Sequence, residues 1–328
     1  MDQPRDRRSF LVQSAAIVAG MGAGNSFATQ NKEQPVDALA QIPIVDPHQH
    51  LWDLTKFKLP WHSGNTPLAR SFVTADYLAA TQGLNVVKTV YMEVDVEPTQ
   101  QVQEAEYVLD LCGRKDNPMC GAVISGRPAS DAFKAYIERY KGNPFIKGVR
   151  QVLHGDGTPA GYCLDGQFVK SVQLLGELGM SFDLCLRSGE LLDGDKLVGQ
   201  CPKTRFVVDH CGNMSVRETD AVKRKVWMDG MKALAQRENT ICKVSGIVAS
   251  AKEDWKPADL EPNIRFTLDT FGPDRVMFAG DWPVCTLRAT FRQWVDALKS
   301  IVKNDPPANQ KKLFHDNGVK FYGLKDKD

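Results

Sequence analysis

The sequence predicts an α/β protein that folds as a single-domain (β/α)8 TIM barrel. Eight short runs rich in β-branched residues recur between residues 42 and 284, and segments of helical period lie between them. Strands that alternate with helices are typical of a parallel sheet whose two faces are both covered. The chain has 328 residues, 42% of them apolar, which suits one barrel with a sizeable core.

The predicted strands follow one another at intervals that leave room for a helix after most of them. They are 42–50, 86–95, 119–126, 146–154, 180–187, 205–212, 241–248 and 276–284. The sequence has neither GxGxxG after an early strand nor a P-loop, so a nucleotide-binding fold lacks its main signature. Eight such units therefore favour a closed barrel over an open sheet.

Helices are predicted where apolar residues recur at helical spacing between cap residues. The segment 74–84 shows these signals, because it begins with a threonine cap and contains a glycine near its end. The same reasoning predicts a closing helix at the end of the chain. The full set is 74–84, 102–115, 130–141, 168–179, 221–238, 291–302 and 309–324.

The N-terminal segment differs from the rest of the chain. Arg7 and Arg8 precede a Gly/Ala-rich apolar run that ends at Ala28. This pattern is typical of a twin-arginine export signal and predicts an exported, periplasmic protein that contacts the export machinery. The run is too short and glycine-rich for stable membrane insertion. The predicted organisation is signal 1–28, linker 29–41, barrel 42–324 and tail 325–328.

Charge and cysteine content narrow the function further. Lysines and arginines number 41 against 40 acidic residues, without a basic stripe, which argues against a nucleic-acid partner. Cysteines in apolar runs, with no CxxC pair, predict buried free thiols in a protein folded before export. A small molecule is the expected partner, and the oligomeric state is left open.

Polar residues cluster at the ends of the predicted strands, where a barrel carries its active site. His48 and His50 stand at i and i+2 in IVDPHQHLWD, so a strand would place both side chains on one face. His210 closes the sixth run and Asp281 the eighth. Burying a charged side chain in an apolar strand costs free energy unless the charge is paired. The shared position of these residues at the ends of predicted strands therefore predicts a functional site there.

Five segments, in this order, carry a resemblance: VDPHQHLWD, GVRQVLH, FVVDHCG, CKVSGI and FAGDWPV. They resemble the amidohydrolase-related TIM-barrel hydrolases (amidohydrolase 2) over residues 42–324. The resemblance is to the lactonase branch, which includes fuconolactonases, rhamnonolactonases and 2-pyrone-4,6-dicarboxylate lactonases. It implies that His48, His50, His210 and Asp281 surround a reacting carbonyl. Many members add a metal-binding histidine on strand five, but here MSFDLCLR has none.

Opening a lactone needs a general base for water and donors for the developing oxyanion. We therefore predict a hydrolase of a small sugar-derived or dicarboxylic lactone. Asp281 would be the base, and His48, His50 and His210 would polarise the carbonyl. His48, His50 and Asp281 could instead hold one divalent metal ion, with zinc as the first expectation. Metal-free catalysis is the alternative.

Further residues are predicted to contact the substrate. Arg150 and Lys243 could orient the hydroxyl or carboxylate groups of the substrate. Alternatively, each could form an ion pair within the protein. Arg150 would then pair with Asp183, and Lys243 with Glu93 or Asp209. Residues 54–72 after the first strand are expected to form part of the substrate wall. The predicted substrate contacts are Arg150, His154, Lys243, Trp52 and Trp282.

Two other functions are considered. One is a metal-dependent non-oxidative decarboxylase, because the resembled superfamily includes such enzymes with HxH and a strand-eight aspartate. The missing histidine of strand five argues against it, since that chemistry depends on the metal. The other is a non-catalytic binding barrel, which would bind a ligand tightly without turnover.

Overall fold

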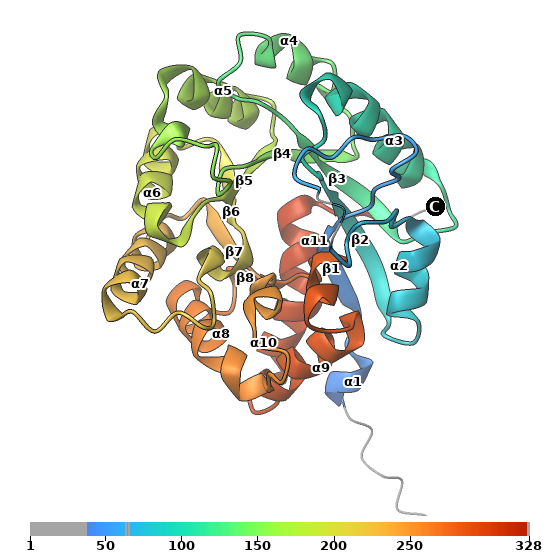
Figure 1. The fold of residues 1–328 in the computed structure, drawn as a ribbon, viewed down its shortest axis with the longest axis vertical. Coiled ribbons are helices and arrows are strands. Elements are labelled where there is room, and N and C mark those ends of the chain that lie inside the picture. Colours follow the sequence, from blue (N-terminus) through green and yellow to red (C-terminus); the bar gives the residue numbers. More distant parts are fainter. Residues whose placement is uncertain (1–37, 63, 65, 327–328) are drawn as a thin grey trace, which may run out of the picture. The chain divides into compact units, whose positions relative to one another are not determined.

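The computed structural model describes residues 38–62, 64 and 66–326. The predicted export signal and most of the predicted linker lie outside the described residues. Eight parallel strands form one sheet in the order β1 to β8, and helices surround them (Figure 1). The predicted (β/α)8 barrel is therefore confirmed.

Each strand is shorter than the run that predicted it, because the chain leaves the extended conformation where the polar residues begin. After β8 the backbone turns left-handed at Asp281, and after β6 at His210. The strands are β1 (Ile44–Gln49), β2 (Val86–Met92), β3 (Met119–Ser125), β4 (Ile146–Val152), β5 (Ser181–Cys185), β6 (Arg205–Val208), β7 (Thr240–Val244) and β8 (Val276–Phe278).

The first and last strands meet beyond the end of β8. Gln49 and Trp282 form a parallel bridge, and the His50 amide donates to the Trp282 carbonyl at 2.8 Å. The seam thus holds the segment with both histidines beside the segment with Asp281.

Asp46 reinforces this seam from the side of the sheet that faces the helices. Its Oδ1 accepts from the amides of Gly280 at 2.7 Å and His48 at 3.2 Å. Its Oδ2 accepts from the Tyr77 hydroxyl at 2.8 Å. Burial raises the pKa of Asp46, although these three donors oppose the shift. This carboxyl therefore fixes the spacing between the β1 and β8 ends.

Most predicted helices are present, and α9 has the predicted bounds. The Thr290 hydroxyl caps it by accepting from the Gln293 amide at 3.1 Å. The helices are α1 (Ala38–Gln41), α2 (Thr74–Thr81), α3 (Gln101–Gly113), α4 (Phe133–Glu138), α5 (Gly166–Glu177), α6 (Leu191–Gln200), α7 (Ala221–Ala235), α8 (Pro257–Phe271), α9 (Phe291–Val302), α10 (Pro307–Lys311) and α11 (Asn317–Tyr322).

Three of these helices, α1, α6 and α8, were not predicted, α1 lying in the predicted linker, and the predicted closing helix was wrong in detail. A π-helical turn, Lys312–Asp316, separates α10 from α11. In α6, Gly194 weakens the helical signal, yet a Cβ there would lie 2.8 Å from the Leu186 side chain. In α8, Pro262 has the same weakening effect. Packing of the apolar faces of α6 and α8 overrides these local preferences.

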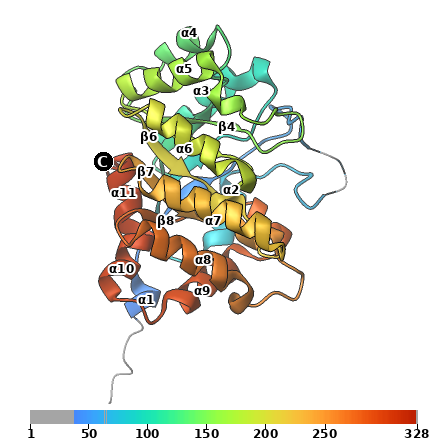
Figure 2. The same cartoon turned by 90° about the vertical axis from the view of Figure 1, so that its left-hand side faces the viewer.

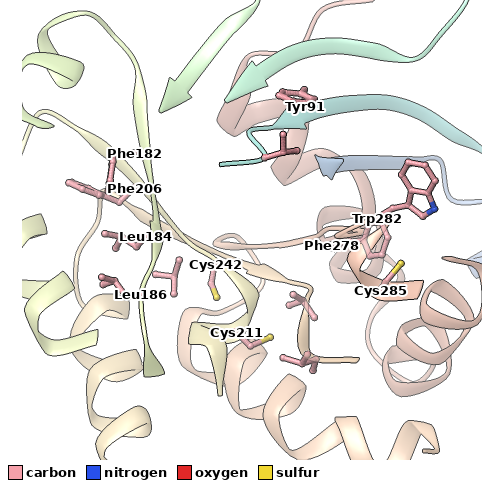
Figure 3. Packing of buried hydrophobic residues seen from close by; sticks show 14 of the residues in the cluster. Tyr91, Phe182, Leu184, Leu186, Phe206, Cys211, Cys242, Phe278, Trp282 and Cys285 are labelled. Atoms are coloured by element: carbon pink, nitrogen blue, oxygen red, sulfur yellow. The ribbon is translucent and has the colours of Figure 1, made fainter. Parts of the chain in front are cut away.

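Apolar packing fills two layers. Between sheet and helices, Phe182 and Leu184 of β5 lie beside Phe206 of β6 (Figure 3). Inside the barrel, a second cluster includes side chains from several strands together with Tyr322 of α11 and Leu324. Figure 2 shows α11 at one end of the barrel, with the long loops that follow the strands projecting at the other. The loop end is therefore the one available for a site.

All eight cysteines are buried, as predicted. Within residues 38–62, 64 and 66–326, no helix is long and apolar enough to cross a membrane.

Candidate active site

A cavity of about 410 Å³ lies at the carboxyl ends of the strands. Most of the predicted site residues line it, namely His50, Trp52, Arg150, His154, His210 and Asp281. The others, His48, Lys243 and Trp282, lie behind its surface. Sequence reasoning did not assign a role to some of the remaining lining residues, which include Trp61, Leu68, Asp95, Asn213 and Gly246.

Asp281 and His50 face each other in this cavity. Asp281 Oδ1 lies 3.3 Å from His50 Nε2. His50 Nδ1 lies 3.0 Å from the Met92 carbonyl, which can only accept, so Nδ1 carries the proton. In its neutral form, His50 would direct an unprotonated Nε2 toward the Asp281 carboxylate. A water proton or a cation between these two atoms would satisfy both.

His48 lies directly behind them and is fully buried. Its Nδ1 is 3.2 Å from Lys243 Nζ, and its Nε2 is 3.3 Å from an Arg150 Nη1 and 3.7 Å from Asp281 Oδ1. Burial and the Lys243 cation lower the pKa of His48 well below its usual range. The ring is therefore neutral at pH 7, and cations lie beside both of its nitrogens.

His210 completes the imidazole cluster, with its ring centroid 4.5 Å from that of His48. Its Nδ1 is 2.9 Å from the Ser245 hydroxyl, which leaves Nε2 for other partners. Burial lowers the pKa of His210 as well. Among the lining residues, His154 likewise has a pKa lowered chiefly by burial, so both rings are neutral at pH 7.

A layer of buried ion pairs supports the cluster from below. Lys243 Nζ donates to Asp183 at 2.5 Å and to Asp209 at 3.2 Å. Arg150 donates through Nε and Nη2 to the Glu93 carboxylate and carbonyl, at 2.6 and 2.8 Å. Of the predicted pairings, Lys243 with Asp209 is present, whereas the partner of Arg150 is Glu93. Lys243 is fully buried, so its predicted substrate contact is wrong.

The acids of this layer differ in pKa. Burial raises the pKa of Asp183 to about 7 despite Lys243. Burial alone would also raise that of Asp209, but Lys243 and His48 hold it well below its usual range. Lys243 therefore stabilises chiefly the ionised form of Asp209.

The tryptophans divide between wall and interior. Trp52 lines the cavity, whereas Trp282 is 2% exposed, with its ring packed against Phe72 and Tyr77. The predicted substrate contact of Trp282 is therefore corrected. Trp61, from the long loop after β1, takes this place at the mouth and is 42% exposed. Trp61 belongs to residues 54–72, the segment that the sequence predicted as part of the substrate wall.

The sequence profile of the amidohydrolase family matches residues 45–324. The chain belongs to the amidohydrolase family. This confirms the resemblance that the five sequence segments predicted, and with it the prediction of a hydrolase.

Known proteins similar to this amidohydrolase include lactonases and a decarboxylase. An L-fucono-1,5-lactonase from Burkholderia multivorans is 27% identical over 79% of this chain and 87% of its own length. An amidohydrolase from the same species, solved with bound zinc, has a TM-score of 0.77 at 21% identity, covering 86% of this chain and all of its own. A 2,6-dihydroxybenzoate decarboxylase has a TM-score of 0.62 at 13% identity, covering 86% and 99%. The likeness to the two solved structures shows the fold alone.

The amidohydrolase contains a donor set that fits one cation. Ligand atoms of His48, His210 and Asp281 lie within 4.8 Å of one another. His50 Nε2 approaches Asp281 as well, at 3.3 Å. The sequence predicted His48, His50 and Asp281 as the metal ligands. In the compact group of the structure, His210 takes the place of His50. Two imidazoles and a carboxylate form the kind of set that holds zinc in catalytic sites.

A second group, Cys185, Asp209 and His210, also has its ligand atoms within 4.8 Å. Arg150 Nη1, however, lies 3.9 Å from Cys185 Sγ and 3.5 Å from Asp209 Oδ2. A metal ion among these three groups would meet this permanent positive charge. The same guanidinium nitrogen lies 3.3 Å from His48 Nε2 of the first group, so positive charge lies beside both donor sets.

The position of His210 depends on Gly246, and this gives a prediction for the amidohydrolase. Gly246 has φ of +69°, and a Cβ there would lie 2.4 Å from His210 Nδ1. Gly246→Ala is therefore expected to displace the imidazole and to lower kcat/KM by at least about tenfold. The measurement uses the lactone that the wild-type protein opens.

Gly272→Ala is the matched control, because Gly272 has φ of +72° and no atom within 4 Å of a built Cβ. Both glycines have positive φ, with ψ of −31° at Gly246 and 167° at Gly272, so both variants carry backbone strain of about 1 kcal/mol or more, but only Gly246→Ala disturbs the site. Equal activity of the two variants would show that the contact with His210 is not needed.

Proposed function

We propose that this amidohydrolase opens a small lactone by attack of water on the ring carbonyl. The observation that carries this proposal is the approach of the Asp281 carboxylate to His50 Nε2 within the cavity, at 3.3 Å. Two acceptors at this distance can hold both hydrogens of one water molecule. The L-fucono-1,5-lactonase named above supports a lactone as the class of substrate.

Asp281 removes a proton from this water as its oxygen attacks the carbonyl carbon. His50 accepts the second hydrogen and orients the water, since its Nε2 has no proton to give to a carbonyl. This changes the role that sequence reasoning assigned to His50. Asp281 then returns its proton to the ring oxygen as the C–O bond breaks, and the product is a hydroxy acid.

The developing oxyanion needs donors. Arg150 lines the cavity and has N–H groups beyond those bonded to Glu93 and His48. His210 presents Nε2–H when the Ser245 hydroxyl donates to its Nδ1. These two groups are the proposed oxyanion donors, and His48 supports them from behind as a neutral ring.

The proposal includes a single divalent metal ion, with zinc as the first candidate. The chelation experiment below tests whether it is needed. Asp281, His48 and His210 would hold it, and it would supply Lewis acidity to the carbonyl. Arg150 already places positive charge beside these groups, which favours at most one metal.

Proton release on a panel of aldonolactones and pyrone dicarboxylates, with and without chelator, tests the function. We expect release on at least one lactone. Loss of release on chelation, with recovery on added zinc, would support the metal. Carbon dioxide released from an aromatic acid, with no lactone opened, would overturn the proposal in favour of a decarboxylase. Tight lactone binding without turnover would favour a non-catalytic barrel.

A further inference from the structure

Asp95 is an acidic residue of the cavity that the proposed chemistry does not use. It follows β2 with φ of +49°, a left-handed conformation that asparagine and aspartate tolerate better than most residues. Its amide donates to Glu93 Oε2 at 2.6 Å, and an Arg127 Nη2 donates to its Oδ1 at 2.6 Å. Glu93 therefore holds the backbone of Asp95, and Arg127 holds its side chain.

The second carboxylate oxygen of Asp95 is available to a ligand. Among the described residues, none donates a hydrogen bond to Oδ2, while Asp95 lines the cavity that contains Asp281. A preorganised carboxylate oxygen at a cavity wall accepts hydrogen bonds from hydroxyl groups.

The charge balance of the cavity argues against an anionic substrate. Asp95 and Asp281 contribute carboxylates to the lining, and the arginine of the lining is Arg150. Arg150 already donates through Nε and Nη2 to Glu93. This pair of N–H groups therefore cannot bind a substrate carboxylate through two parallel hydrogen bonds. Lys243 lies beneath the floor, fully buried. A substrate carboxylate would meet these like charges, and the described lining has no arginine or lysine other than Arg150, which is already paired with Glu93.

The remaining walls suit a ring with an apolar face. Trp61 lies at the mouth, anchored by donation of its Nε1 to the Val94 carbonyl at 2.7 Å. Its ring meets that of Trp52 edge to face, with centroids 5.6 Å apart. Leu68, Val152 and Val284 complete the apolar lining. Such walls pack against C–H groups of a ring whose hydroxyls point toward a polar residue.

We infer that Asp95, held by Arg127, is the specificity-determining residue of the cavity and accepts hydrogen bonds from the hydroxyl groups of an uncharged, hydroxylated lactone. This inference rests on the proposed function and narrows it from lactones in general to uncharged ones with ring hydroxyls. Pyrone dicarboxylates, which sequence reasoning left open, are then poor substrates.

The test compares three substrates, an aldono-1,5-lactone, unsubstituted δ-valerolactone and a pyrone dicarboxylate, with wild type and Asp95→Asn. Asparagine keeps the shape and tolerates the left-handed backbone. On the aldonolactone we expect kcat/KM to fall about 10- to 100-fold, chiefly through KM. On δ-valerolactone the fall should not exceed about threefold, because no hydroxyl contact is lost.

Asp131→Asn, at an exposed position, is the matched control for the loss of one negative charge. An equal fall on aldonolactone and δ-valerolactone would overturn the inference, because Asp95 would then act on the reaction or the fold. Faster opening of the pyrone dicarboxylate than of the aldonolactone by wild type would also overturn it. If wild type opened none of the three, the lactonase proposal itself would fail, and the inference with it.

Discussion

Replacement of Asp281 by asparagine is expected to lower kcat by about 10²- to 10⁴-fold, the usual contribution of a general base. The carboxylate that would take the water proton becomes an amide without basicity. KM should change little, because proton transfer occurs only in the transition state. Initial rates on the lactone that wild type opens, together with urea unfolding, give the result.

The fold should survive this change. Asp281 has φ of +51°, and asparagine adopts this conformation as readily as aspartate. Alanine would be a poorer choice, because it would add backbone strain to the loss of the base. Asp254→Asn, which removes an exposed carboxylate, controls for the change in net charge. Retention of more than about a tenth of wild-type kcat by Asp281→Asn would mean that another group accepts the proton.

The barrel could be predicted from the sequence because its strands are short, apolar and rich in β-branched residues. Helix α9 was predicted to the residue, since Thr290 caps a strongly amphipathic segment. Helix α6 was missed because Gly194 weakens local propensity, yet that glycine permits close approach to Leu186. The information that specifies α6 thus lies in its tertiary packing, which a one-dimensional pattern does not contain.

The catalytic cluster was predictable for a related reason. A charged or imidazole side chain at the end of an apolar strand has few stable environments other than a site or an ion pair. His50, His210 and Asp281 therefore stood out in the sequence, and the structure places all three at the cavity.

Depth within the barrel was not predictable. Lys243 and Trp282 both follow the strand-end pattern, but one lies below the cavity floor and the other behind its wall. The difference depends on the stagger between strands and on the left-handed turns at residues such as His210. Neither property is encoded in the spacing of residue types. Trp61 was included only within the expected substrate wall of residues 54–72, and Asp95, at the end of the second predicted strand, received no role because the sequence does not show that Arg127 holds it.

Replacement of Lys243 by methionine is expected to lower the free energy of unfolding by about 3–5 kcal/mol, the usual cost of removing one partner from a buried ion pair. Lys243 Nζ is 2.5 Å from Asp183 and 3.2 Å from Asp209, and all three side chains are fully buried. Methionine fills a similar volume, so the loss measured by urea unfolding reports the uncompensated carboxylates. A loss below about 1 kcal/mol would show that Arg150 alone balances this layer.

A second variant separates charge from packing. In Lys243→Met/Asp209→Asn the acid that Lys243 keeps ionised is neutral as well, so at least about 1 kcal/mol of the stability should return. The cation also acts on His48, whose Nδ1 lies 3.2 Å away. A nearby positive charge disfavours imidazolium, so its removal should raise the pKa of His48, although burial still opposes protonation. A histidine titration by NMR that moved upward in Lys243→Met would therefore assign Lys243 a positioning role, in which it keeps His48 neutral behind Asp281. An unchanged titration would restrict Lys243 to stabilising the barrel interior.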